Sequence, residues 1–249
     1  FGKTIQRGDD AQLKQEALSV AKDADVIVCA MGETADMSGE CGTRTNLEMP
    51  DVQHELLAEL VKLGKPVVLL NFAGRPTVLT WEKQHVGAIL NVWFGGSETG
   101  DAICDVLFGD KVPTGKLTTS MPKTTGQEPL YYNHQNTGRP VPDDNPQFAK
   151  YASNCLDVSN GPLYPFGYGL SYTTFAYGDL HLSASSASIN NEEADAWQGD
   201  KKITATITVK NTGSRDADEV VQLYIRDMVA SISRPIKELK GFLRIHLAA

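Results

Sequence analysis

Two glutamates, Glu33 and Glu40, stand in a glycine-rich loop that follows an apolar segment of the chain. This segment, residues 25–30, is uncharged after its first residue and rich in β-branched side chains, which is typical of a buried parallel strand. The loop therefore leaves the carboxyl end of a strand, where α/β proteins place residues that do chemistry. In the same loop, Arg44 can pair with a carboxylate and Ser38 can form hydrogen bonds.

The loop resembles a known family. The Ser-Gly-Glu sequence at 38–40, followed by Arg44, Leu47 and Pro50, is similar to the acid/base loop in the second domain of glycoside hydrolase family 3. That family cleaves β-linked sugars with two carboxylates. Further segments resemble the same domain in the same order, and particularly the bacterial periplasmic β-glucosidases of the family: 65–70, 74–76, 93–100, 105–110, 113–117, 131–140 and 163–172.

The resemblance implies a role for each candidate residue. Retaining β-glycosidases use a nucleophilic carboxylate and a second carboxyl group, about 5 to 5.5 Å away, that protonates the leaving oxygen and then activates water. The resemblance assigns the second role to Glu40, which precedes Arg44 as in the family's Glu-x-x-x-Arg pattern. Glu33 is the competing candidate, but its place next to the strand end suits a structural hydrogen-bonding role better. We expect Arg44 to hold the loop and Ser38 to bond either sugar or loop backbone.

The composition narrows the class of partner. A net charge of -8 disfavours nucleic acid, because such binding depends on Lys and Arg contacts with phosphates. The sequence has no run of about 18 apolar residues, so we expect no membrane span. The histidines show no metal-ligand spacing, and the turn at 95–100 lacks both dinucleotide and P-loop patterns. We therefore predict no metal and no cofactor, and the net charge fits a neutral ligand such as a sugar better than a polyanion. The resemblance implies that the substrate is a β-linked glucoside or oligosaccharide.

The four cysteines match no zinc-binding pattern. Cys29 and Cys104 lie in apolar surroundings in the sequence and are predicted to be core residues. Cys41 and Cys155 fall in loops, and sequence alone leaves a bridge between them open.

Helix and strand patterns alternate in the first part of the chain. Helices are predicted over 10–22, 51–63 and 98–108, strands over 25–30, 67–70 and 88–93, and a short helix or turn over 77–83. This alternation predicts an α/β fold: a three-layer α/β sandwich with a mostly parallel sheet and helices on both faces. The irregular stretch 113–165 is expected to cover a site or wrap a neighbouring domain.

From about residue 173 the pattern changes to short strands, predicted over 180–182, 203–209, 220–225 and 239–247. This part resembles the start of a fibronectin type III-like sandwich, which needs about seven strands in about 100 residues when complete. We therefore expect two domains. Residues 1–172 would form the family 3 C-terminal α/β sandwich domain, truncated at its N-terminus, and residues 173–249 a partial fibronectin type III-like domain.

The resemblance predicts a fragment of a retaining exo-β-glycosidase, most simply a β-glucosidase, whose nucleophilic aspartate lies in an N-terminal barrel domain outside this chain. The fragment alone is expected to be inactive. A β-xylosidase or another family 3 exo-glycosidase is the alternative among enzymes, because sugar selection resides mostly in the barrel. A non-catalytic carbohydrate-binding or scaffold module is the alternative outside enzymes. By resemblance the location is periplasmic or secreted, and this chain shows no signal peptide.

A half sandwich is expected to expose an apolar face made by Val220, Leu223, Leu239, Phe242 and Ile245. The sequence is consistent with three partners that would cover this apolar face: a second copy of the chain in a homodimer, the α/β domain, or a separate chain that carries the missing strands.

Overall fold

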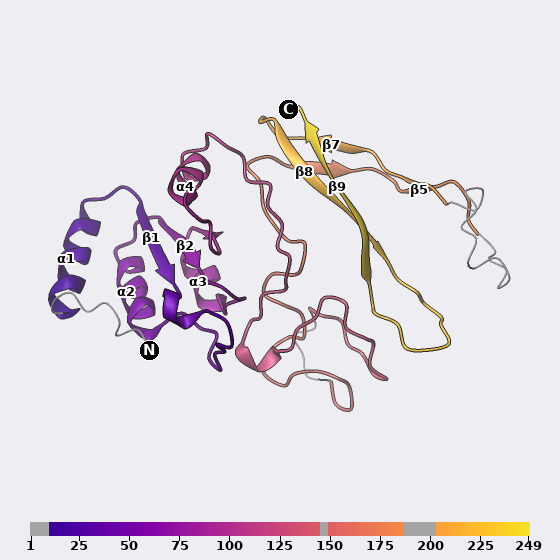
Figure 1. Cartoon of the computed structure of the whole chain (residues 1–249), viewed down its shortest axis with the longest axis horizontal. Coiled ribbons are helices and arrows are strands. Elements are labelled where there is room, and N and C mark those ends of the chain that lie inside the picture. The colour runs from indigo at the N-terminus through magenta and orange to yellow at the C-terminus, as the bar shows by residue number, and fades with distance from the viewer. Residues whose placement is uncertain (1–9, 145–148, 187–202) are drawn as a thin grey trace.

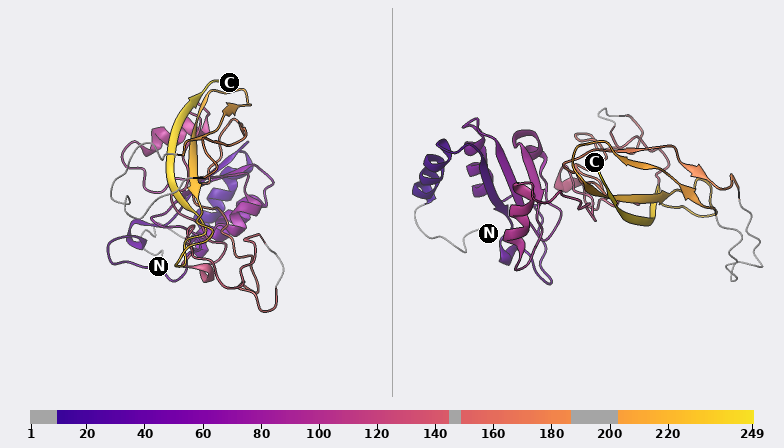
Figure 2. Two further views of the ribbon diagram at one scale, coloured as in Figure 1. Left: turned by 90° about the vertical axis from the view of Figure 1, so that its right-hand side faces the viewer. Right: turned by 90° about the horizontal axis from the view of Figure 1, so that it is seen from above.

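The computed structural model describes residues 10–144, 149–186 and 203–249. An α/β region lies at one end and paired β-strands at the other, with a long irregular segment between them (Figure 1, Figure 2). The α/β region comprises α1 (Asp10–Lys22), β1 (Ile27–Gly32), α2 (Asp51–Val61), β2 (Val67–Phe72), α3 (Thr80–His85), β3 (Ala88–Asn91) and α4 (Thr99–Leu107). Single turns of 3-10 helix occur at η1 (Ala35–Met37) and η2 (Thr125–Gln127). The predicted α/β class is confirmed.

The sheet of this region has the strand order β1-β2-β3, and both strand pairs are parallel, as predicted. Alternate residues of β1 and β2 meet side chains from α1, α2 and the start of α3 in one core. Leu57 on α2 and Leu69 on β2 lie at its centre, fully buried. Two residues of the irregular segment, Met121 and Leu163, complete this core, so the segment belongs to the packing of the α/β region.

Helix α4 differs from the other helices because none of its residues is buried. Cys104 on α4 is therefore exposed, and the prediction of a core position for it is wrong, whereas Cys29 on β1 is buried as predicted. The apolar neighbours of Cys104 in sequence form a helix that lies outside the core, so local hydrophobicity was a misleading guide there.

The irregular segment is held by backbone pairing between its two ends. Met121 N donates to Tyr164 O at 2.8 Å, and Leu163 N donates to Met121 O at 2.8 Å. Leu117 N donates to Tyr168 O at 2.8 Å in the same arrangement. The two ends therefore run side by side and return the chain toward the α/β core.

The described residues of the β-region form six strands in three antiparallel pairs, β4–β7, β5–β6 and β8–β9. Their bounds are β4 (Phe175–Tyr177), β5 (His181–Leu182), β6 (Ala205–Thr206), β7 (Val209–Asn211), β8 (Ala217–Ile225) and β9 (Glu238–Leu247). The single strand predicted over 203–209 is divided between β6 and β7, and β4 was not predicted. A strand of three residues is too short to show an alternating pattern.

The pairing of β8 with β9 corrects the prediction of one apolar face. Val220 and Leu223 are three positions apart on β8 and so point to opposite sides of the hairpin. Phe242 pairs with Gln222 and so shares a side with Val220, whereas Ile245 pairs with Glu219 and lies on the side of Leu223. The predicted apolar residues are therefore distributed over both sides of the hairpin.

Strand β8 is attached to the irregular segment and to β4 through a buried carboxylate. Tyr177 Oη donates to Glu219 Oε1 at 2.9 Å, and Lys116 Nζ lies 3.2 Å from Glu219 Oε2. Gln222 Nε2 also donates to Gly167 O at 3.0 Å. Burial, the hydrogen bond to Glu219 and the charge of that carboxylate raise the pKa of Tyr177 to about 12.

Candidate functional site

The base of the candidate loop is fixed where β1 ends. The side chain of Gln53 on α2 bonds both backbone groups of Gly32, with Oε1 accepting from N at 2.7 Å and Nε2 donating to O at 2.9 Å. Glu33 N then donates to Phe72 O at the end of β2 at 2.7 Å. These bonds to two neighbouring elements set the position from which the Glu33 side chain leaves the sheet.

The Glu33 carboxylate is buried between two arginines, with only 1% of its side chain exposed. Arg44 Nη1 donates to Oε1 at 2.8 Å, and Arg75 Nε lies 3.0 Å from Oε1 and 3.2 Å from Oε2. Gly74 N donates to Oε2 at 3.2 Å. Burying a carboxylate is costly unless charges and donors of this kind compensate it. We call Glu33, Arg44 and Arg75 the arginine clamp.

Each arginine of the clamp also binds a backbone carbonyl of the loop. Arg75 Nη2 donates to Met37 O at 2.6 Å, and Arg44 Nη2 donates to Glu48 O at 3.3 Å. These two carbonyls lie on either side of Glu40 along the chain. The clamp therefore holds both flanks of the loop that carries Glu40.

Glu40 itself stands at the exposed apex of the loop, in a turn closed by the bond from Gly42 N to Gly39 O at 3.1 Å. No residue in the described parts of the chain is shown in a hydrogen bond or ion pair with its carboxylate. Cys41, the next residue, has a left-handed backbone with φ of 60°. The structure thus combines a fixed base with a carboxylate that is open to a reactant.

Ser38 lies where the loop passes the β2–α3 connection. A Cβ atom placed on Gly74 would stand 2.1 Å from Ser38 Oγ, so this approach requires glycine at position 74. Arg44 pairs with a carboxylate, that of Glu33, and Ser38 lies against Gly74 of the β2–α3 connection. Glu40 is the one predicted site residue that lies apart from this group, and its catalytic role stays a prediction.

Gly74 and Arg75 are site residues that the sequence analysis did not assign. They follow the carboxyl end of β2, which is the parallel neighbour of β1. Carboxyl ends of parallel strands meet at one edge of a sheet, so the segment after each strand is a candidate contributor to the same site. That rule could have identified Arg75 as a partner for the loop.

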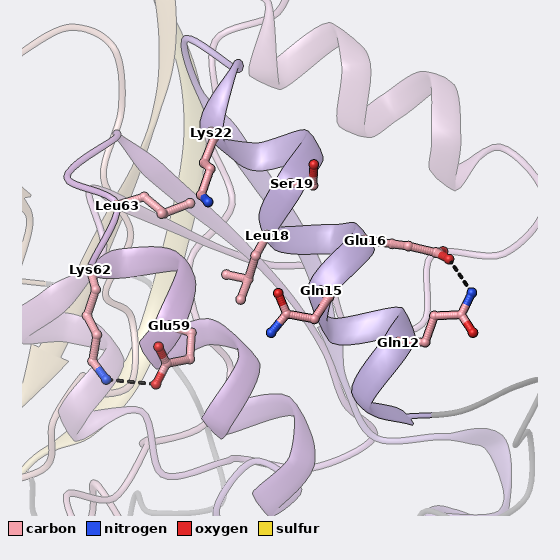
Figure 3. Close-up of a pocket in the computed structure, with 9 residues that line it drawn as sticks. All are labelled: Gln12, Gln15, Glu16, Leu18, Ser19, Lys22, Glu59, Lys62 and Leu63. Carbon is pink, nitrogen blue, oxygen red and sulfur yellow. Dashed lines mark hydrogen bonds and ion pairs between the residues drawn. The ribbon is translucent and has the colours of Figure 1, made fainter.

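Other features do not contribute to this loop. A hollow of about 520 Å³ lies between α1 and the end of α2, and Figure 3 shows two bonded polar pairs in its lining, Gln12 with Glu16 at 2.9 Å and Lys62 with Glu59 at 2.7 Å. Cys41 and Cys155 are exposed free thiols. The described part of the chain holds no cluster of three or more His, Cys, Asp or Glu suited to a metal ion. Among the described helices, none is long and apolar enough to cross a membrane.

Comparison with known proteins gives matches along most of the chain. Residues 3–172 match the glycosyl hydrolase family 3 C-terminal domain, and residues 219–249 match a fibronectin type III-like domain. The chain is 49% identical to a periplasmic beta-glucosidase of Salmonella typhimurium, over 93% of this chain and 29% of that protein. It is 40% identical to a beta-xylosidase of Formosa agariphila, over 93% of this chain and 30% of that protein.

Solved structures agree with these matches. A beta-glucosidase from Listeria innocua, in complex with isofagomine, superposes with a TM-score of 0.82 at 38% identity, covering 98% of this chain and 32% of that one. A b-glucosidase from Erythrobacter marinus gives a TM-score of 0.83 at 34% identity, with the same coverage of 98% and 32%. The chain spans less than a third of the length of each of these relatives. Through this C-terminal α/β domain, the chain belongs to glycoside hydrolase family 3.

Proposed function

We propose that this chain supplies the general acid/base of a retaining exo-β-glycosidase, with Glu40 in that role and β-glucosidase as the activity. The observation that carries the proposal is the geometry of the loop: an exposed carboxyl group at the apex of a loop whose two flanks are bound to a buried clamp. In this proposal the nucleophile is an aspartate of a barrel domain outside these 249 residues. The barrel and this loop together would form the site.

The proposed reaction has two steps. The aspartate attacks the anomeric carbon, the glycosidic C–O bond breaks, and Glu40 gives its proton to the departing oxygen. Glu40, now ionised, takes a proton from water, whose oxygen attacks the same carbon and releases the sugar and the aspartate. Only protons and a glycosyl group move, so the chemistry needs no redox cofactor.

The proposed substrate is a β-linked glucoside or oligosaccharide. Support comes from the beta-glucosidases among the relatives and solved structures. A β-xyloside is the second candidate, because the Formosa agariphila relative is named a beta-xylosidase. A panel of aryl β-glycosides assayed with the intact enzyme separates the two by kcat/KM. The periplasmic relative also supports a periplasmic or secreted location.

The test of the acid/base assignment is the substitution Glu40→Gln in the intact enzyme. General-acid help, typically about 10² to 10⁴-fold, matters most when the leaving oxygen is basic. We expect kcat/KM to fall by that factor for alkyl glucosides and much less for an activated aryl glucoside such as the dinitrophenyl compound. The matched control is Glu55→Gln, an exposed glutamate on α2 outside the loop. Equal loss for all leaving groups, or no loss, would overturn the assignment.

The 249-residue chain alone gives a second test. Without the nucleophile, most of the transition-state stabilisation is missing, so purified chain should hydrolyse aryl β-glucosides no faster than buffer. Turnover by this chain would contradict the division of the site between two domains. If the chain alone bound oligosaccharides in calorimetry while Glu40→Gln left the intact enzyme fully active, a non-catalytic binding module would replace the proposal.

A further inference from the structure

We infer that Glu33 is a positioning residue for the reaction: without touching substrate, its carboxylate sets the place of Glu40 through Arg44 and Arg75. This inference rests on the proposed function of Glu40. Beyond that proposal, the inference is that the Glu33 carboxylate is needed to hold Glu40 within reach of the oxygen that it protonates.

The first support is the way in which each arginine connects two groups. Arg44 bonds the Glu33 carboxylate and the carbonyl of Glu48, and Arg75 bonds the same carboxylate and the carbonyl of Met37. A guanidinium is planar and rigid, so the directions of its N–H bonds are fixed relative to one another. Each arginine therefore holds a loop carbonyl at a set distance from Glu33.

The second support is the burial of the clamp. The Glu33 side chain is 1% exposed, and those of Arg44 and Arg75 are 19% and 18% exposed. Interactions between charges are stronger and less screened by salt in such surroundings than at the surface. Without the negative charge at Glu33, the two guanidinium groups would repel each other and turn toward water. Both loop carbonyls, at Met37 and Glu48, would then lose their donors.

The third support is the attachment of the clamp to the sheet. Glu33 Oε2 accepts from Gly74 N at 3.2 Å, and Glu33 N donates to Phe72 O at 2.7 Å. Both partners belong to the end of β2 and the connection after it, which are part of the frame of the sheet. Glu33 thus anchors the loop to the sheet. The apex of the loop, from Gly39 to Gly42, lies between the two flanks that the clamp holds.

Such a frame matters for proton transfer. A general acid must stand within about 2.6 to 3.2 Å of the oxygen it protonates. A displacement of about 1 Å can lower a rate by about 10²-fold. Because no hydrogen bond or ion pair joins the Glu40 carboxylate to another described residue, its position depends on the flanks that the clamp holds.

The experiment compares Glu33→Gln with Glu40→Gln in the intact enzyme. Gln keeps the size of the side chain, but it lacks the charge, and its NH₂ group would face an arginine donor. We expect kcat for poor leaving groups to fall by about 10 to 100-fold, less than for Glu40→Gln, with KM changed by less than about threefold. The alkaline limb of the pH profile should remain in Glu33→Gln, since Glu40 still acts as acid, and should disappear in Glu40→Gln.

The matched control is Glu82→Gln on α3. Glu82 is also buried, and its carboxylate lies 3.3 Å from His54 Nδ1 on α2, whereas among the described residues no hydrogen bond or ion pair joins that carboxylate to the loop. This variant should keep the wild-type dependence on leaving group. Hydrogen exchange gives a readout besides activity: amides 35–48 should exchange at least about tenfold faster in Glu33→Gln and at the wild-type rate in Glu82→Gln.

If Glu33→Gln does not fold, Arg75→Lys replaces it as the test, because lysine keeps the charge next to Glu33 but cannot also reach Met37 O. For Arg75→Lys we expect a smaller fall in kcat for poor leaving groups and a smaller increase in the exchange of amides 35–48 than for Glu33→Gln. If Glu40→Gln behaves as an acid/base variant while the clamp variants keep wild-type leaving-group dependence and exchange, the positioning role is overturned and the proposed function stands. If Glu40→Gln shows no leaving-group dependence, the proposed function fails first.

Discussion

Leu57 and Leu69 in the α/β region have no exposed surface, whereas Phe242 and Leu243 in the β8–β9 hairpin are 73% and 64% exposed. The parallel sheet of the α/β region has helices packed on it and so encloses a core. In the described part of the β-region, β8 and β9 pair with each other and with no third strand. A two-stranded hairpin is at best marginally stable by itself.

The comparison shows two different sources of order in one chain. The α/β region depends on apolar burial, which is non-directional and proportional to area. The β-region depends on directed polar contacts, such as those of Glu219 with Tyr177 and Lys116 and of Asp218 with Arg244. Substitutions should therefore affect the two regions in different ways, which the following three predictions test.

The largest effect is expected in the core of the α/β region. Leu69→Ala should lower the free energy of unfolding by about 2 to 5 kcal/mol, because it removes buried methyl groups and leaves a cavity. The control, Leu243→Ala on β9, should change it by no more than about 0.5 kcal/mol. Denaturant unfolding of the 249-residue chain, followed by circular dichroism, measures both. Similar losses for the two variants would show that the hairpin contributes a core after all.

An intermediate effect is expected at the junction of the two regions. Glu219→Gln should cost about 1 to 3 kcal/mol, because the change weakens a buried carboxylate with two partners. The loss should be local: amides of β8 and β9 should exchange faster, while those of β1 and β2 keep their rates. Glu238→Gln, whose ion pairs are more exposed, serves as control and should cost less than about 1 kcal/mol. Faster exchange across the whole chain would mean that the two regions unfold as one unit.

The smallest effect is expected from Tyr177 at high pH. Its pKa in the folded chain is raised to about 12, above the value of about 10 for an unperturbed tyrosine. A raised pKa means that the folded state binds the proton more tightly, so this stabilisation is complete below pH 10 and is lost as the pH rises to about 12. Tyr177→Phe should show a weaker loss of stability over that window. The difference in phenolate absorbance between the wild-type chain and Tyr177→Phe reports the ionisation of Tyr177 alone, and it should appear near pH 12. If it appears near pH 10 instead, the contact with Glu219 does not raise the pKa of Tyr177.

The same comparison explains which parts of the fold could be predicted from sequence. Core positions such as Leu57 and Leu69 recur at helical or strand spacing, so the helices and strands around them were predicted within a few residues. Strand β4 has three residues and no such pattern. Strand register determines which side of β8 packs against the rest of the chain. Because β8 carries apolar residues on both sides, such as Val220 and Leu223, its sequence does not indicate which side that is.

The candidate site divides in the same way. Glu33, Ser38, Glu40 and Arg44 were found from one continuous loop and its resemblance to a family. The partner that completes the clamp, Arg75, comes from the next strand end, and its contact with Glu33 depends on the sheet rather than on local sequence. A sequence pattern indicates which residues share a loop, but contacts between loops require the strand order.

Gly32, at the end of β1, determines which residue types the chain tolerates at the entry to the loop. A Cβ atom at this position would stand 1.9 Å from Phe72 O, the carbonyl that accepts the bond from Glu33 N, and the backbone has φ of 137°. Every other amino acid would therefore displace that carbonyl and, with it, the backbone of Glu33. In a library with all twenty residues at position 32, glycine alone should preserve the loop, although this residue has no side chain and takes no part in the proposed reaction.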